Sequence, residues 1–163
     1  MADSRADDLV RNASVLIADR SQAARRVTRS MLINLGVRSI AEAEDGLSAL
    51  ESITSSNPDA LLIDWDLPKL SGLEVVRTVR CPKRFPRADL PIIMFTAWAE
   101  RRNVLMALRC GANEFLAKPT STLALKDRLV SVLGQRRAMV RLGNYYVPAP
   151  RIWPPKLREY LRD

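Results

Sequence analysis

Short apolar segments alternate with longer amphipathic segments along most of this 163-residue chain. The apolar segments have the length of buried strands, and the amphipathic segments carry apolar residues at helical spacing. This alternation predicts parallel strands joined by helical crossovers. The expected strands are residues 15–18, 37–41, 60–63, 91–95 and 114–117. The expected helices follow Ser21, pass through residues 47–53, cover residues 72–80, pass through residues 104–108 and cover residues 121–137.

Residues that favour caps and turns mark several of these boundaries. Ser21 is placed to cap the first helix, and Gly36 suits its end. Asn57 and Pro58 break the second helix. Five strand–helix units in this order predict an α/β fold with a doubly wound parallel sheet.

Polar residues with complementary chemistry follow the ends of four of the expected strands. They are Asp19, Asp64, Thr96 and Lys118. Because ligands of an open parallel sheet bind beyond the carboxyl ends of its strands, these groups are expected to converge. Each one alone is most simply a solvated loop residue, but together they suit phosphoryl transfer to a carboxylate. A metal ion, an ammonium and a hydroxyl would then offset the charge of the phosphoryl oxygens. Asp64 is the expected nucleophile because it ends the most apolar strand.

Composition narrows the possible chemistry further. The chain has no histidine, which excludes Ser-His-Asp and Cys-His nucleophile systems, histidine-ligated metals and any phosphohistidine carrier. A metal would have to be hard and oxygen-ligated, as magnesium and calcium are. Cys81 and Cys110 lack the number and spacing of a disulfide framework or zinc site. No apolar run is long enough to insert into a membrane, and the first residues are polar, so we expect a cytoplasmic protein.

Positive charge is concentrated near the C-terminus. The formal net charge is +8, and residues 136–163 contribute +5 of it. Residues 138–163 contain four prolines and no long helical period, which argues against a helix-turn-helix or winged-helix effector domain. We expect this tail to pack along the domain or to dock on a partner. The alternative, which we do not favour, is electrostatic contact with nucleic acid. The residues that would make such contacts are Arg136, Arg137, Arg141, Arg151, Lys156, Arg158, Arg162, Tyr145, Tyr146, Trp153 and Tyr160.

Several short motifs make the chain similar to a known family. From about Ser14 to Gly134 it resembles the receiver domain of response regulators, the family of the chemotaxis response regulator. The matching segments are VLIAD at 15–19, AEDG at 43–46, LIDWDLP at 62–68, SGLE at 71–74, FTA at 95–97, GANEF at 111–115 and KP at 118–119. The resemblance implies a flavodoxin-like five-stranded sheet in the order 2-1-3-4-5. It divides the chain into an N-terminal segment (1–13), a receiver domain (14–137) and a basic tail (138–163).

The resemblance also implies roles for the residues at the strand ends. Asp64 would be the phosphoacceptor, and Thr96 the hydroxyl that moves toward the phosphoryl group. Lys118 would be the lysine of the site, joined to Pro119 by a cis bond. Mg²⁺ would be bound by Asp19, by Asp64 and by the backbone carbonyl of Asp66. Phe115 would occupy the position of the aromatic switch residue, where simple packing is an equally good interpretation.

Partners follow from the same resemblance. The phosphodonor would be a sensor histidine kinase or a phosphotransfer protein, and the chain would be a signalling protein rather than an enzyme. The signal would pass to a downstream protein through the helix at 104–108, the strand at 114–117 and the last helix. This surface would include Arg101, Arg102, Arg109 and Phe115, and a homodimer through it is possible.

Two positions depart from the family pattern. The usual acidic pair after the first strand is here Asp19 and Arg20, so a cation replaces one carboxylate near the metal. Two charges about 6 Å apart interact by about 3 kcal/mol at an effective dielectric near 20, so Arg20 should weaken Mg²⁺ binding. In the alternative hypothesis, Arg20 pairs with Asp64, stands in for part of the metal and biases the domain toward an active-like state, so that switching would not depend on phosphorylation. Trp98, two residues after Thr96, either shields the site from water or faces a partner.

One enzyme class shares part of the pattern. Asp64 and Asp66 have the Asp-x-Asp spacing of haloacid dehalogenase-like phosphatases, which also use a later threonine and lysine. Those enzymes need further acidic metal ligands after the lysine, whereas the next acid here is Asp127, inside the last helix. The Asp-x-Asp also follows the third strand. Its placement therefore argues against this alternative.

Overall fold

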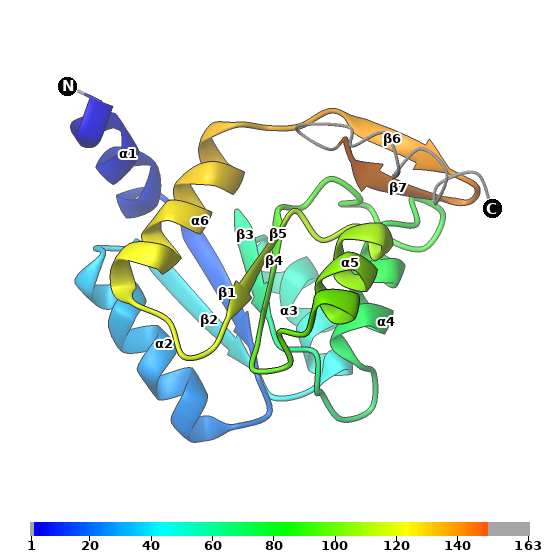
Figure 1. Cartoon of the computed structure of the whole chain (residues 1–163), viewed down its shortest axis with the longest axis horizontal. Coiled ribbons are helices and arrows are strands. Elements are labelled where there is room, and N and C mark those ends of the chain that lie inside the picture. Colours follow the sequence, from blue (N-terminus) through cyan, green and yellow to red (C-terminus); the bar gives the residue numbers. More distant parts are fainter. Residues whose placement is uncertain (1, 150–163) are drawn as a thin grey trace.

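The computed structural model describes residues 2–149 and confirms the expected α/β fold. Five parallel strands form one sheet in the order β2-β1-β3-β4-β5 (Figure 1). The strands are β1 (Ser14–Ala18), β2 (Ser39–Ala43), β3 (Ala60–Ile63), β4 (Ile92–Thr96) and β5 (Glu114–Ala117). The crossover helices are α2 (Gln22–Asn34), α3 (Gly46–Ser56), α4 (Gly72–Val79), α5 (Arg101–Cys110) and α6 (Thr122–Gly134).

The core lies in two layers, one on each face of the sheet. Every residue of β1, β3 and β4 is buried, so these strands supply side chains to both faces. On one face, α3, α4 and α5 pack through residues such as Ile53, Val76 and Ala107. On the other face, α2 and α6 pack through Leu32 and Leu129. This arrangement explains why the central strands read as continuous apolar runs rather than alternating ones.

The second strand was predicted two residues too early, and the helix before it explains the error. The expected range was 37–41, whereas β2 is Ser39–Ala43. Gly36 has a φ of +78°, and the Val37 N–H donates to the Leu32 carbonyl at 3.1 Å. Val37 therefore still belongs to the closing turn of α2, although its side chain is apolar and β-branched. The last helix likewise ends at Gly134, short of the expected residue 137.

Two elements outside the five-unit pattern were not expected. Helix α1 (Ala2–Arg11) precedes β1 and lies against α6, where Asp7 pairs with Lys126 at 2.6 Å. Strands β6 (Met139–Leu142) and β7 (Tyr145–Pro148) form an antiparallel hairpin. Both lie toward the edge of the sheet where the strands begin (Figure 1). The Gly143-Asn144 turn between two apolar segments was a hairpin signal that sequence reasoning missed.

The hairpin packs along the domain, as one of the two interpretations of the tail predicts. Its Tyr146 N–H donates to the Arg80 carbonyl at 2.9 Å, and Arg137, just before it, donates to the Asn113 carbonyl. The tail residues from 150 onward, including Arg151, Trp153, Lys156, Arg158, Tyr160 and Arg162, lie outside the described residues. Their role stays a prediction.

Beneath the hairpin, Arg80 is completely buried at the end of α4. Its guanidinium donates to the Gly111 carbonyl at 2.8 Å, the Ala88 carbonyl at 2.7 Å and Asn113 Oδ1 at 2.8 Å. All three acceptors are neutral, and burial lowers the pKa of Arg80 to about 9. Arg80 thus ties α4 to the α5–β5 connection and to the loop before β4.

Candidate phosphoacceptor site

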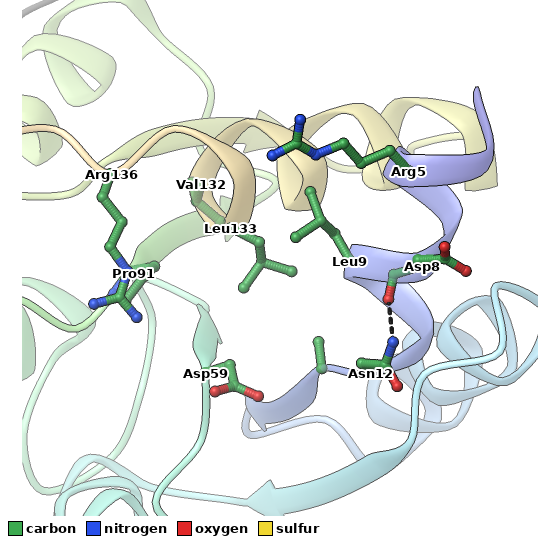
Figure 2. A pocket seen from close by; sticks show the side chains of 10 residues that line it. Arg5, Asp8, Leu9, Asn12, Asp59, Pro91, Val132, Leu133 and Arg136 are labelled. Carbon is green, nitrogen blue, oxygen red and sulfur yellow. Dashed lines mark hydrogen bonds between the residues drawn. The ribbon is translucent and has the colours of Figure 1, made fainter. Parts of the chain in front are cut away.

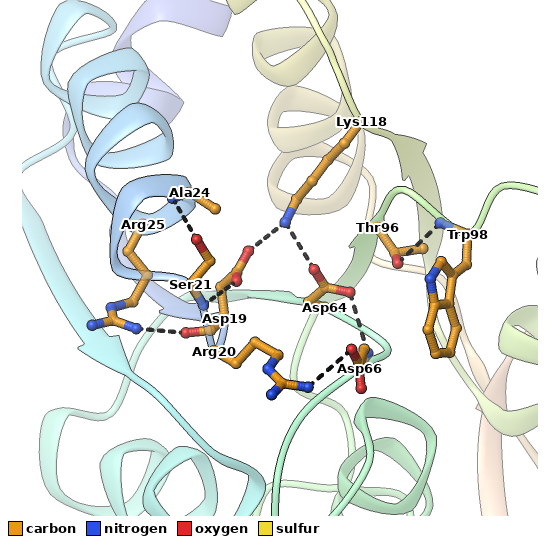
Figure 3. A network of polar contacts seen from close by, with 10 residues as sticks. All are labelled: Asp19, Arg20, Ser21, Ala24, Arg25, Asp64, Asp66, Thr96, Trp98 and Lys118. Atoms are coloured by element: carbon orange, nitrogen blue, oxygen red, sulfur yellow. Dashed lines mark hydrogen bonds and ion pairs between the residues drawn. The ribbon is translucent and has the colours of Figure 1, made fainter.

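The charged side chains expected at the strand ends meet at one rim of the sheet (Figure 3). Asp19 follows β1, Asp64 follows β3, Thr96 ends β4 and Lys118 follows β5. The Lys118 ammonium lies between the two carboxylates, where it donates to Asp64 Oδ2 at 2.9 Å and to Asp19 Oδ2. Two carboxylates from neighbouring strands therefore share one cationic atom.

Backbone and side-chain contacts hold Asp19 in place. Its side chain is almost completely buried, and Oδ1 accepts a hydrogen bond from the Ser21 N–H at 2.8 Å. Arg25 donates to the Asp19 carbonyl at 2.7 Å and also pairs with Glu42 on β2 at 3.4 Å. Sequence reasoning missed Arg25 and Glu42, because an Arg on an amphipathic helix usually indicates a solvated face.

Asp64 is positioned mainly by the loop that follows β3. Its N–H donates to the Ala18 carbonyl at 2.9 Å, which joins β3 to β1. The Asp66 N–H donates to Asp64 Oδ1 at 3.3 Å. Gly72, the first residue of α4, lies so close that an added Cβ would be 2.2 Å from the Asp64 carbonyl oxygen. The close approach of α4 to the nucleophile therefore requires a residue without a side chain.

Lys118 stays charged at this rim. Burial alone lowers the pKa of a lysine, but the hydrogen bonds from Lys118 to Asp19 and Asp64 outweigh it, so the pKa of Lys118 is raised. The Lys118 ammonium also lies 5.0 Å from the centre of the Phe95 ring. The Lys118–Pro119 peptide bond is cis, as expected.

The raised pKa of Lys118 predicts how this contact responds to alkaline pH. Its stabilising effect is fully present below the unfolded lysine pKa of about 10.4 and is lost as pH rises through the higher folded pKa. We therefore expect the difference in unfolding free energy between wild type and Lys118→Met to be constant from about pH 7 to pH 9 and to shrink above about pH 10.5. Denaturant titrations across this range would measure it, with the exposed Lys83→Met as the control. A difference that already shrinks near neutral pH would contradict the assignment.

Thr96 and two tryptophans form the next part of the rim. Thr96 is buried, and its Oγ1 accepts a hydrogen bond from the Trp98 N–H at 3.3 Å. Because that bond uses an oxygen lone pair, the Thr96 hydroxyl hydrogen remains available for donation. The half-exposed Trp98 indole lies 6.5 Å from the Trp65 ring, centre to centre, with the planes tilted by 48°. Phe115, on β5, is half-buried and packs against the core cluster that α3, α4 and α5 cover.

Arg20 pairs with Asp66 rather than with Asp64, so the structure does not support the alternative in which Arg20 contacts the nucleophile directly. Its guanidinium pairs with the Asp66 carboxylate at 3.2 Å. Lys118 and the Asp66 N–H each donate to one oxygen of Asp64, while Arg20 contacts the more exposed Asp66 carboxylate. Figure 3 shows Arg20 extending toward Asp66 from the end of β1.

The carboxylate oxygens at the rim, counted together with backbone oxygen, are ligands that suit a hard cation. Within residues 2–149, no three acidic or cysteine side chains gather closely enough to hold a metal ion by themselves. The two carboxylates of Asp19 and Asp64 nevertheless converge on one ammonium, so they can also converge on a metal. Magnesium typically takes one or two carboxylates plus water and phosphate oxygens. Asp19 and Asp64 therefore fit a magnesium ion.

A separate groove lies far from this rim and carries no comparable chemistry (Figure 2). It has a volume of about 350 Å³ and is bounded by α1, α6 and the starts of β3 and β4. Its polar residues, which include Arg5, Asp8, Asp59 and Arg136, do not converge on one point. The rim around Asp64 is therefore the better candidate.

None of the helices within the described range is long and apolar enough to cross a membrane.

Comparisons with known proteins agree with this geometry. Residues 15–130 match the response regulator receiver domain family. A chemotaxis protein CheY homolog of Campylobacter jejuni is 37% identical over 121 residues, which is 74% of this chain and 92% of the relative. The chemotaxis protein CheY1 of Helicobacter pylori is 36% identical over the same share of this chain and 96% of its own length.

Solved structures show the same similarity. A putative response regulator from Chloroflexus aurantiacus has a TM-score of 0.70 and 30% identity over 76% of this chain and 99% of its own. The receiver domain of a sensor histidine kinase from Pseudomonas aeruginosa, with a magnesium ion coordinated in its active-site cleft, has a TM-score of 0.68 and 30% identity, with the same coverage of both chains. The fold, the converging groups at the rim and these relatives lead to one conclusion: the chain belongs to the response regulator receiver domain family, whose members act in two-component signalling.

Proposed function

We propose that this protein accepts a phosphoryl group on Asp64 and passes the resulting signal on through protein contacts. The observation that carries the proposal is the shared position of the Lys118 ammonium between Asp64 and Asp19. A carboxylate that attacks phosphorus needs nearby positive charge, because the phosphoryl oxygens bring further negative charge to the site. Lys118 supplies that charge next to the attacking oxygen.

The other residues at the rim have complementary roles. Asp64 attacks phosphorus, and Thr96 donates its free hydroxyl hydrogen to a phosphoryl oxygen. Magnesium, when bound, offsets charge on the phosphoryl oxygens. Asp19, Asp64 and the backbone carbonyl of Asp66 are the residues that would hold it. Arg20, which lies next to these ligands, weakens that binding. Trp98 limits the access of water to the acyl phosphate.

The proposed partners are of two kinds. The phosphodonor is a sensor histidine kinase or a phosphotransfer protein, and the receiver of the signal is a downstream protein. The proposed output surface comprises α5, β5 and α6. On α5, Leu105 and Leu108 are exposed, next to Arg101 and Arg102. An apolar strip bordered by cations suits a partner segment that is both apolar and acidic. A homodimer through the same surface, and a cytoplasmic location, also remain predictions.

Labelling with acetyl phosphate tests the central step. We expect the wild-type protein to gain one phosphoryl group, detected by intact mass, faster with magnesium than with a chelator. Asp64→Asn should gain none, because an amide oxygen is a far weaker nucleophile than a carboxylate. Asp8→Asn, which removes an exposed carboxylate on α1, is the matched control and should be labelled like wild type. Equal labelling of Asp64→Asn and wild type would overturn the proposal.

A further inference from the structure

Arg20 occupies an unusual place at the rim. Its Asp66 partner sits two residues after Asp64 and donates its own N–H to Asp64 Oδ1. The side chains of this ion pair are 57% and 46% exposed. Exposed pairs of this kind add little to stability, because solvent screens them and two flexible side chains must be ordered. The guanidinium is therefore held close to the nucleophile by a contact that is easily exchanged.

The neighbouring cations are less free to move. The Lys118 side chain is 19% exposed and bridges Asp19 and Asp64. Arg25 is 13% exposed and is held by both the Asp19 carbonyl and Glu42. An arriving phosphoryl group carries several anionic oxygens, and Lys118 is a single point donor. Among the cations of the rim, Arg20 combines two properties. Its existing ion pair is weak, and its planar guanidinium can donate two parallel hydrogen bonds to the oxygens of a phosphoryl group.

We propose that Arg20 is a catalytic residue for phosphorylation of Asp64, and that its guanidinium exchanges the Asp66 carboxylate for the phosphoryl oxygens. This inference rests on the proposed function and concerns small acyl phosphates as donors. An Asp64 carboxylate oxygen attacks phosphorus and forms a new O–P bond. The bond between phosphorus and the acyl oxygen breaks, and its electron pair leaves with the carboxylate product. No proton or other reactant is needed for the balance. Arg20 donates hydrogen bonds to the phosphoryl oxygens, whose bonds to phosphorus neither form nor break in this step.

A catalytic role for Arg20 and simple repulsion of the metal by Arg20 predict opposite effects on phosphorylation when Arg20 is removed. If Arg20 only repels magnesium, its removal should tighten metal binding and speed phosphorylation at low magnesium, with no loss at saturation. If Arg20 binds the phosphoryl group, its removal should weaken phosphoryl binding even when magnesium is saturating. The metal affinity of each variant can be measured independently through tryptophan fluorescence, since Trp65 directly follows Asp64.

Beryllofluoride, a stable mimic of the phosphoryl group, provides a test without turnover. We expect its dissociation constant at saturating magnesium to rise about tenfold in Arg20→Ala, because a charge-assisted bidentate contact is lost. The limiting rate of labelling by acetyl phosphate should fall by a similar factor. Arg20→Lys keeps the positive charge but cannot form two parallel hydrogen bonds to the phosphoryl group. Its dissociation constant and labelling rate should therefore lie between those of wild type and those of Arg20→Ala. The matched control is Arg26→Ala, an exposed arginine on α2 whose removal changes the net charge equally and should leave both quantities within about twofold of wild type.

The opposite result is equally clear. Beryllofluoride binding by Arg20→Ala that is as tight as that of wild type, or tighter, would overturn the catalytic role. So would an equal loss in Arg26→Ala, because the effect would then reflect overall charge. Failure of the proposed function looks different, since Asp64→Asn would then be labelled as fast as wild type whatever residue stood at position 20.

Discussion

Arg80→Ala should destabilise the fold by about 4 kcal/mol, a large part of the roughly 5–15 kcal/mol that keeps a typical domain folded. The substitution removes three hydrogen bonds from a completely buried side chain. The buried Gly111 carbonyl and the partly buried Ala88 carbonyl would each lose a donor, and the space of the side chain would become a cavity. Burial already disfavours the charge of Arg80, so the loss comes from the orphaned acceptors and the cavity.

Denaturant unfolding measures this effect, and α4 contains a suitable control. Arg77, one turn earlier, is exposed, so Arg77→Ala removes the same side chain from the same helix without a cavity. We expect Arg77→Ala to remain within about 0.5 kcal/mol of wild type. Similar unfolding midpoints for the two variants would show that Arg80 does not tie the structure together.

Gly72→Ala should reduce both stability and phosphorylation, because its Cβ has no free space. The atom would lie 2.2 Å from the Asp64 carbonyl oxygen and 3.0 Å from the Trp65 Cα, and both are backbone atoms that cannot rotate away. Either α4 or the chain at Asp64 must shift. We expect a loss of about 2 kcal/mol in unfolding free energy. Since a displaced nucleophile reacts poorly, the rate of labelling by acetyl phosphate should fall about tenfold or more.

Gly134→Ala is the control for this substitution. The nearest atom to its added Cβ is the end of the flexible Leu9 side chain, at 3.1 Å. Alanine also favours a helix more than glycine does, so little change is expected in either quantity. Wild-type stability and labelling in Gly72→Ala would mean that the loop after β3 adjusts without affecting Asp64.

The sheet and the rim could be predicted because topology determines both. The strands β3 and β5 were predicted with the bounds that the structure has, since their segments are short, apolar and bordered by clear breaks. Once the strands are parallel, their carboxyl ends share one edge, and Asp19, Asp64 and Lys118 have to approach one another. The identity of the converging groups then indicates the chemistry.

The contacts that depend on rotamers could not be predicted in this way. Whether Arg20 pairs with Asp64 or Asp66 depends on the rotamer of its long, exposed side chain, which the sequence does not specify. Arg80 looks like a surface residue in a helical pattern, because its acceptors come from loops whose positions depend on the tertiary fold, at Ala88 and at Gly111. Helix α1 was missed since its sequence is mostly polar, and among its residues from Ser4 to Arg11 only Val10 is fully buried.

The position of the hairpin places residues that affect stability away from residues that affect reactivity, two properties that often conflict. Arg80, Asn113 and β7 meet near the edge where the strands begin, while Asp64 and its partners lie where the strands end. Substitutions at sites that are distant and share no partners usually have additive effects. Changes beneath the hairpin can therefore alter the thermal tolerance of the protein while the reactivity of its phosphoacceptor stays constant. An engineer could tune one property first and the other afterwards, in either order.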